Sequence, residues 1–236
     1  MSKGKLYLIP SPIGDNDPVE VLPRTVFEIL PRIRRFVVEE VRTARRFLSR
    51  AGLKGTIQDL EFHTLNEHTS PAAAEALLGL FDGGSDVGLI SEAGLPAVAD
   101  PGAVLVELCH RHGIEVVPLV GPSSLMLALM SSGLNGQSFA FCGYLPAKTD
   151  ERRQAIIAVE KRSRQLHQTQ IFIETPYRSD ALLGDLIATC NPSTRLAVAA
   201  NATMPDALYR MKTVARWREE APPTIGKRPC VFLILA

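Results

Sequence analysis

Two short turns near the middle of the chain contain small residues that would let a small molecule lie close to the backbone. One, residues 91–96, follows the apolar run at 87–90, and the other, residues 121–124, follows the apolar run at 114–119. The runs predict two strands with an amphipathic helix between them. Such a βαβ unit has parallel strands that lie adjacent or close, and ligands bind at the carboxyl ends of parallel strands. Either turn alone is equally well explained as an ordinary loop, but two at the same end of one unit predict a shared ligand site.

Acidic and basic side chains follow another candidate strand, residues 35–39. Glu39 and Glu40 end this run, and Arg42, Arg46 and Arg50 then recur every four residues, on one face of a predicted helix. A line of arginines can bind the phosphates of a nucleic acid. A solvated helix face balanced by nearby glutamates is the alternative, and for this feature taken alone it is the favoured hypothesis.

Composition excludes several classes of protein. The chain has 236 residues, of which 46% are hydrophobic and 22% charged, and its formal net charge of +1 does not by itself indicate a nucleic-acid binder. The four cysteines form no CxxC pair, so we expect buried free thiols in a reducing cytoplasm and no metal site. No signal segment or bilayer-length apolar run is present, so we expect a cytoplasmic protein without a membrane partner. The glycine spacings of Rossmann and P-loop nucleotide sites are also missing.

The elements that would position these residues predict an α/β protein of two domains, residues 1–120 and 121–236. The first half alternates strands and helices and predicts a parallel sheet, whereas the second half adds a hairpin, residues 194–201 and 208–213, that makes its sheet mixed. A helix is expected over residues 21–30, and the last strand, 229–236, is expected in a covered or edge position. The other expected strands are residues 5–10, 35–39, 58–63, 138–144 and 170–174.

Seven sequence motifs occur in one order along the chain: LYLIPSPIGD, EEVRTARRFL, FHTLNEH, GLISEAGLPAVADPG, VVPLVGPSS, FCGYLPAK with ERR shortly after it, and IFIETPYR. Together they resemble the S-adenosylmethionine-dependent methyltransferases of the tetrapyrrole methylase fold (class III methyltransferases). The branch that they resemble most is the ribosomal small-subunit RNA cytidine 2′-O-methyltransferases. The resemblance implies two α/β domains with S-adenosyl-L-methionine bound in the cleft between them, a homodimer, and no metal.

The resemblance also implies roles for individual residues. Glu40 and Arg42 are the first candidates for catalysis, with Glu39 and His63 as further candidates near strand ends. Substrate contacts are expected from Arg46, Glu67, Lys148 and Arg152. The residues expected to bind the cofactor are Pro12, Ser91, Glu92, Ala93, Gly94, Pro96, Ala97, Val98, Ser123, Tyr144, Ala200 and Asn201.

Some motifs depart from the RNA-methylating branch. Its usual Glu-Asp-Thr-Arg is here Glu39-Glu40-Val41-Arg42, and residues 196–206 are more similar to the porphyrin and corrin methylases. Methylation of a ribose 2′-hydroxyl in ribosomal RNA, with the RNA or the small ribosomal subunit as partner, is the leading hypothesis. A methylase of a tetrapyrrole or another small molecule is the first alternative. The second is a non-catalytic S-adenosylmethionine-binding sensor or ribosome-associated factor.

Overall fold

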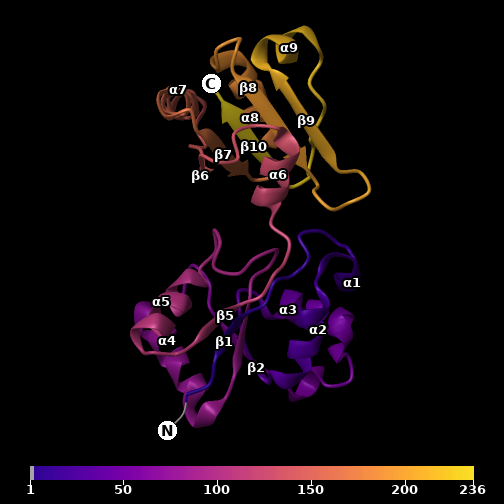
Figure 1. Cartoon of the computed structure of the whole chain (residues 1–236), viewed down its shortest axis with the longest axis vertical. Coiled ribbons are helices and arrows are strands. Elements are labelled where there is room, and N and C mark those ends of the chain that lie inside the picture. Colours follow the sequence, from indigo (N-terminus) through magenta and orange to yellow (C-terminus); the bar gives the residue numbers. More distant parts are fainter. Residues whose placement is uncertain (1–2) are drawn as a thin grey trace. The chain divides into compact units, whose positions relative to one another are not determined.

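The computed structural model describes residues 3–236. Contacts divide the chain into two compact units, with the division between Ser123 and Ser124. Each unit is built on its own five-stranded sheet (Figure 1). Among the described residues, no helix is both long enough and apolar enough to cross a membrane.

The sheet of the first unit is entirely parallel, as predicted, with strand order β3-β2-β4-β1-β5. β4 and β5 are parallel and close, with β1 between them. The loop that follows β1 is therefore placed between the two small-residue turns. The strand bounds are β1 Leu6–Leu8, β2 Arg35–Val38, β3 Glu61–Thr64, β4 Val87–Ile90 and β5 Val116–Pro118.

The helical segments of this unit are shorter than the sequence pattern predicts. The helix expected over residues 21–30 is confirmed in its later part, but its start is wrong, because Pro23 has no amide hydrogen to continue a helix and α2 starts directly after it. The expected strand at 58–63 is also partly wrong, since residues 57–59 form a 3₁₀ turn and β3 begins only at Glu61. The helical bounds are α1 Pro18–Val21, α2 Arg24–Ile29, η1 Leu30–Arg32, α3 Val41–Leu48, η2 Ser49–Leu53, η3 Ile57–Asp59, α4 Pro71–Ala76, η4 Leu77–Gly84 and α5 Ala103–Arg111.

Both faces of the first sheet are covered. Phe36, Val38 and Ile90 pack with α2 and α3, whereas Val37 and Leu89 pack with α4 and α5 (Figure 1). Adjacent residues on a strand thus serve opposite cores, which is the pattern of a doubly covered parallel sheet. All four residues of β4 are buried, so the turn that follows β4 starts from a rigid strand.

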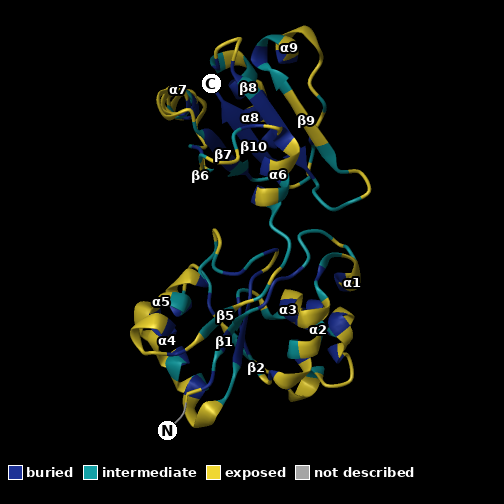
Figure 2. Ribbon diagram, in the orientation of Figure 1, coloured by how far each residue is buried: buried dark blue, intermediate teal, exposed yellow. Residues whose placement is uncertain are grey.

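The sheet of the second unit is mixed, as predicted, with order β6-β7-β10-β8-β9. β6 and β7 are parallel, and the predicted hairpin of β8 and β9 is confirmed. The last strand does not lie at an edge: β10 is central and pairs antiparallel with both β7 and β8, and all its residues are buried (Figure 2). The strand bounds are β6 Phe139–Tyr144, β7 Thr169–Glu174, β8 Arg195–Ala200, β9 Leu208–Thr213 and β10 Cys230–Leu235.

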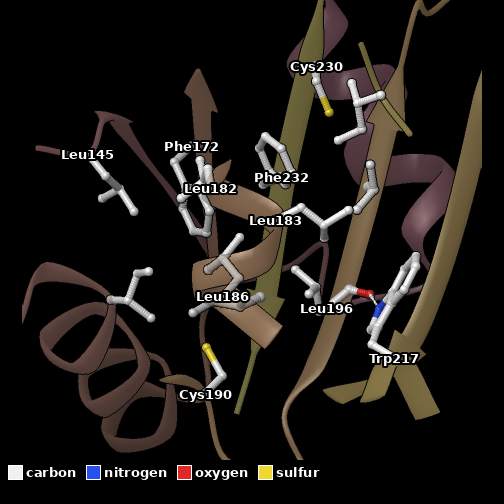
Figure 3. Close-up of a cluster of buried hydrophobic side chains, with 14 of the residues drawn as sticks. Leu145, Phe172, Leu182, Leu183, Leu186, Cys190, Leu196, Trp217, Cys230 and Phe232 are labelled. Atoms are coloured by element: carbon white, nitrogen blue, oxygen red, sulfur yellow. Dashed lines mark hydrogen bonds between the residues drawn. The ribbon is translucent and has the colours of Figure 1, made fainter. Parts of the chain in front are cut away.

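Four helices accompany this sheet: α6 Ser124–Ser132, α7 Thr149–Leu166, α8 Ser179–Thr189 and α9 Val214–Glu219. The sequence pattern did not predict α9, which places Trp217 in the core, where its indole nitrogen donates to the carbonyl of Leu196 at 3.0 Å (Figure 3). Cys190 and Cys230 are buried free thiols, as expected, and burial raises the pKa of each to about 12.

Candidate functional site

The loop after β1 and the turn after β4 are joined by a pair of backbone hydrogen bonds. The amide of Ser11 donates to the carbonyl of Gly94 at 2.9 Å, and the amide of Gly94 donates to the carbonyl of Ser11 at 3.2 Å. The turn after β5 also packs against this loop, because a β-carbon on Gly121 would lie 2.1 Å from the β-carbon of Pro10. Glycine at position 121 therefore allows the three loops to converge at one end of the sheet.

The segment after β4 has an unusual backbone. Gly94, Ala97 and Ala99 have φ angles of 78°, 66° and 60°. Left-handed conformations at the two alanines cost free energy, and such strain clusters at functional sites. Asp100 holds the end of the segment, since one of its carboxylate oxygens accepts the amide of Gly102 at 2.7 Å. Its other carboxylate oxygen is buried and has no hydrogen-bond partner among the described residues.

A cavity of about 730 Å³ opens beside these loops within the first unit. Its lining includes Pro12, Glu40, Arg42, Arg46 and Glu92, which the sequence assigned to the cofactor, catalysis and the substrate. The volume is in the range of small-molecule and cofactor sites. The structure therefore brings candidates of all three kinds to a single cavity.

Glu40 begins helix α3. Its carboxylate accepts the backbone amide of Thr43 at 2.7 Å and the Thr43 hydroxyl at 3.1 Å, which is an N-cap. Hydrogen bonds from the backbone amides of Arg42 and Thr43 lower the pKa of Glu40. A carboxylate with a lowered pKa and an occupied oxygen is a weak proton acceptor, which argues against Glu40 as a catalytic base.

Glu39 has the opposite environment. Its side chain is partly buried at the end of β2, and its carboxylate accepts the backbone amide of Glu92 at 3.4 Å. Burial is the main cause that raises the pKa of Glu39, and the nearby carboxylates of Asp100, Glu92 and Glu67 raise it further. A raised pKa brings a carboxylate closer to the range that suits a general base. From the sequence alone, Glu39 is only a further candidate behind Glu40. The sequence does not show where α3 begins, so it does not show that Glu40 caps this helix.

Two of the three arginines at positions 42, 46 and 50 already form ion pairs. Arg46 and Arg50 both bind the carboxylate of Asp15, at 2.6 and 2.7 Å, and these hydrogen bonds lower the pKa of Asp15. The side chains are solvent-exposed, so the pairs contribute little to stability. Arg42 also lines the cavity, and the ion pairs of the described residues do not include it. Two arginines that hold one carboxylate form a site suited to any exchangeable oxyanion.

The other candidates of the first unit, Glu39 among them, do not line this cavity. Glu67 follows β3, is exposed, and lies 3.6 Å from the ring of His68. His63 has a buried Nε2 atom without a hydrogen-bond partner among the described residues. Ser91 is buried, and its hydroxyl donates to the carbonyl of Ala93 at 3.4 Å. Val98 is 47% exposed.

Arg152 does not occupy a substrate surface, which corrects the prediction from sequence. The Arg152 side chain is only 5% exposed, and its Nε donates to Asp185 at 2.8 Å while its Nη1 donates to the carbonyl of Ala147 at 2.7 Å. Arg152 therefore joins α7 to α8 inside the second unit. Lys148 remains exposed, with its ammonium 3.1 Å from Glu151.

The candidates of the second unit share one edge of its sheet. β6, β7 and β8 all run in one direction, because β10 is antiparallel to both β7 and β8. Their carboxyl ends carry Tyr144, Glu174 and Ala200, and Asn201 follows in a left-handed conformation with φ 52°. The Asn201 amide donates to the carbonyl of Pro229 at 2.8 Å, so the end of β8 is held against the start of β10. In the described residues, no group of three or more His, Cys, Asp or Glu side chains has metal-binding geometry.

Comparison with known proteins gives relatives by sequence and by fold. The chain is 33% identical over 202 residues to the "Ribosomal RNA small subunit methyltransferase I" of Escherichia coli O157:H7, which covers 86% of this chain and 66% of that protein. It is 36% identical over 197 residues to the protein of the same name from Xylella fastidiosa, covering 84% and 67%. The chain thus spans about two thirds of the length of the curated relatives it matches.

Solved structures share the fold at low sequence identity. A diphthine synthase matches with a TM-score of 0.69 and 14% identity, covering 99% of this chain and 90% of that one. Uroporphyrin-III C-methyl transferase from Thermus thermophilus, solved with S-adenyl homocysteine, matches with a TM-score of 0.56 and 18% identity, covering 98% and 97%. The family model of Tetrapyrrole (Corrin/Porphyrin) Methylases matches residues 5–216, and the chain belongs to this family.

Proposed function

We propose that this protein is an S-adenosyl-L-methionine-dependent methyltransferase that methylates a ribose 2′-hydroxyl of ribosomal RNA in the small ribosomal subunit. The observation that carries the proposal is the cavity of the first unit, where candidates for the cofactor, for catalysis and for the substrate lie together. The names of the curated relatives support ribosomal RNA as the acceptor. A cytoplasmic location and a homodimer belong to the same proposal.

The residues after β4 fit the cofactor. S-adenosylmethionine supplies an electrophilic methyl group on a sulfonium, and its amino-acid and adenosine ends need backbone partners more than a phosphate loop. The segment from Ser91 to Val98 contains the left-handed Gly94 and Ala97 and several small side chains, and Gly94 lets the loop after β1 approach. Pro12 and Ser123 border the same loops. We assign Tyr144, Ala200 and Asn201 of the second unit to the same ligand.

Glu39 is the group that we propose as the proton acceptor, in place of Glu40. The ribose hydroxyl would pass its proton to the Glu39 carboxylate as the ribose oxygen bonds to the methyl carbon and the carbon–sulfur bond breaks. The raised pKa of Glu39 makes its carboxylate a better acceptor than an ordinary exposed one. Arg42, on the cavity wall, would stabilise the negative charge that develops on the ribose oxygen. The protein must also hold the methyl donor and the acceptor in line. Such positioning lowers the activation barrier by ~7–11 kcal/mol in favourable cases.

The RNA backbone would be bound by basic residues beside the cavity. Arg46 and Arg50 hold the Asp15 carboxylate in this structure, and a phosphate of the substrate would take its place. Lys148, which belongs to the second unit, is also exposed, and we propose that it contacts a phosphate of the RNA. Glu67, at the end of β3, would contact the ribose or base edge of the acceptor nucleotide.

A tetrapyrrole or other acidic small molecule is the second candidate substrate. Arg46 and Arg50 bind a carboxylate in this structure, which is the group that a porphyrinogen side chain presents. A third candidate, a non-catalytic sensor, would bind the cofactor without turnover.

Radiolabelled S-adenosylmethionine distinguishes the three. Unmethylated small ribosomal subunits, free ribosomal RNA and a porphyrinogen panel would be offered in parallel to the full chain. We expect label in the RNA, and much slower labelling by Glu39→Gln. Label only in a small molecule would reject the RNA proposal. Cofactor binding in calorimetry without label in any acceptor would support the sensor instead.

A further inference from the structure

Tyr177 is an exposed aromatic residue in the turn between β7 and α8. The residue is 83% exposed, although an aromatic ring gains by burial. The ammonium of Lys227, from the loop before β10, lies 5.9 Å from the centre of the Tyr177 ring. The two residues are fifty positions apart in the sequence, so the fold brings an aromatic face and a cation together on one surface.

The turn that carries Tyr177 is held by a buried carboxylate. The side chain of Glu174 is 0% exposed, and its Oε1 accepts the amide of Thr175 at 2.7 Å and Nε of Arg178 at 3.0 Å. Both neighbours of the Pro176-Tyr177 tip are thus fixed to the end of β7. Tyr177 is presented on an ordered turn before any partner arrives, which reduces the entropy lost on binding.

The loop of Lys227 is tied to the same turn. The carboxylate of Asp180, in the first turn of α8, accepts the amides of Ile225 and Gly226 at 2.7 and 3.1 Å. Arg228 donates to the carbonyls of Thr224 and Ile225 at 2.6 and 2.9 Å. The aromatic ring and the cation are therefore positioned relative to each other by backbone contacts, beyond their own weak attraction.

The charged groups around Tyr177 differ in the partners that they have. Oε1 of Glu174 accepts donors from this cluster, whereas its Oε2 is buried and has no hydrogen-bond partner among the described residues, and both carboxylate oxygens of Asp180 accept backbone amides. Arg178 is paired with Glu174, whereas Arg228 bonds only to carbonyl oxygens that carry no net charge. Lys227 faces the ring of Tyr177. The ion pairs of the described residues do not include Lys227, so its ammonium is available to an anionic partner, and Tyr177 and Lys227 together form an aromatic and cationic platform.

We propose that Tyr177 and Lys227 form a binding site for single-stranded RNA, in which a base stacks on the tyrosine ring and a phosphate pairs with the lysine. This inference rests on the proposed function. An exposed ring beside a cation matches the way proteins bind single strands. A protein partner would instead favour a continuous apolar patch. The platform follows β7 and precedes β10, so it lies at the edge of the second sheet that also carries Tyr144 and Asn201.

The test uses the full chain and a short, fluorescently labelled single-stranded RNA, with binding followed by anisotropy at several salt concentrations. Tyr177→Ala should weaken binding roughly 5- to 150-fold, which is the factor equivalent to about 1–3 kcal/mol for one stacked base. Tyr177→Phe keeps the ring and should bind as the parent does. Lys227→Gln should reduce the slope of log affinity against log salt by about 0.7.

Lys161→Gln is the matched control for charge, because Lys161 is exposed on the later part of α7, toward the opposite edge of the sheet. It should leave the salt slope closer to that of the parent than Lys227→Gln does. Cofactor affinity, measured by calorimetry, should be unchanged in all variants. Loss of cofactor affinity in Tyr177→Ala would overturn the proposal in favour of a cofactor role.

The outcomes separate this inference from the proposed function. If the parent methylates small subunits and Tyr177→Ala binds RNA equally well, the platform is rejected and the proposed function stands. If Tyr177→Ala loses methylation of intact subunits while its RNA affinity is unchanged, the residue contacts a ribosomal protein and the RNA platform is rejected. If the parent neither binds RNA nor methylates it, both proposals fail.

Discussion

The carboxylate of Glu39 accepts a hydrogen bond from the backbone amide of Glu92, across 3.4 Å. This bond joins the end of β2 to the strained turn after β4, where the cofactor is proposed to lie. The neighbouring Glu40, which the sequence favoured, is instead directed to the amide of Thr43. Two adjacent carboxylates thus have different roles, one at the proposed site of reaction and one at the start of a helix.

Glu39→Gln should lower kcat by roughly 10²- to 10⁴-fold, the usual contribution of a general base, and leave cofactor affinity unchanged. Glu40→Gln is the matched control in the adjacent position. It should reduce the melting temperature, because the N-cap of α3 is weakened, and retain most of the activity. Equal losses of kcat in the two variants would contradict the assignment of the base to Glu39.

The rate should depend on the ionisation of Glu39. Burial raises its pKa, and the base acts only when ionised, so kcat/KM should fall as the pH drops through this raised pKa. The raised pKa of Glu39 also affects stability, because the folded state holds the Glu39 proton more tightly than the unfolded state does. This difference stabilises the folded state at pH values below the unfolded-state pKa of Glu39. The stabilisation is lost as the pH rises through the folded-state pKa. In a pH–rate profile, the activity of the parent should fall on the acidic side at a pH above the ordinary pKa of glutamate. The residual activity of Glu39→Gln should lack this acidic limb. An unchanged acidic limb in the variant would assign it to another group.

Asp15→Asn should strengthen RNA binding. The substitution removes the carboxylate that occupies Arg46 and Arg50, so both guanidinium groups become available to phosphates. Affinity should rise, and its dependence on salt should become steeper, in titrations with ribosomal RNA. Asp59→Asn removes one negative charge elsewhere in the first unit and is the control for net charge. An affinity of Asp15→Asn no greater than that of the control would exclude the exchange of carboxylate for phosphate.

Gly121→Ala should destabilise the convergence of the three loops. A β-carbon at this position would lie 2.1 Å from the β-carbon of Pro10, so the backbone has to move, at a cost of about 1–3 kcal/mol. Cofactor affinity should fall with it, because the loop after β1 is displaced. Gly79→Ala is the control in the same unit, since its β-carbon meets no atom within 4 Å. Denaturant unfolding and calorimetry would report the two effects, and a parent-like Gly121→Ala would show that the loops tolerate separation.

Arg152→Ala should lower the free energy of unfolding by about 3–5 kcal/mol, because it leaves the Asp185 carboxylate buried without its main partner. Arg153→Ala removes the half-exposed partner of the same carboxylate and should cost much less. Chemical denaturation of the two variants gives the comparison. A stable Arg152→Ala protein with a reduced salt dependence of RNA binding would restore Arg152 to the substrate surface.

Local patterns predicted much of the fold. The bounds of α6 and β9 agree with the sequence at Ser124–Ser132 and Leu208–Thr213, because in each case small or polar residues end an apolar or alternating run. The features that were missed depend on partners far away in the chain. β10 is central because β7 and β8 both pair with it. Trp217 is buried because α9 packs in the core of the second unit. Neither arrangement leaves a local signal in the sequence.

The candidate site could also be predicted only in part from the sequence. The two small-residue turns and the segment from Glu39 to Arg46 were found from residue types and strand ends, because those depend on short-range order. The different environments of Glu39 and Glu40 could not be found, since they depend on one hydrogen bond to Glu92 and another to Thr43. The burial of Arg152 was missed because Asp185 lies on a different helix. In the sequence, Tyr177 is only one residue of the motif IFIETPYR. Its contact with Lys227 depends on the fold of the second unit.

The most direct test of the central claim is where the methyl group is placed. Small ribosomal subunits lacking the modification would be incubated with the protein and radiolabelled S-adenosylmethionine, and the extracted RNA would be digested with alkali. A methyl on a ribose 2′-oxygen blocks alkaline cleavage at that position, so we predict that the label is recovered in one alkali-resistant dinucleotide and enters it far more slowly with Glu39→Gln. Label on a base, in a porphyrinogen, or in no acceptor while the cofactor binds would contradict the account.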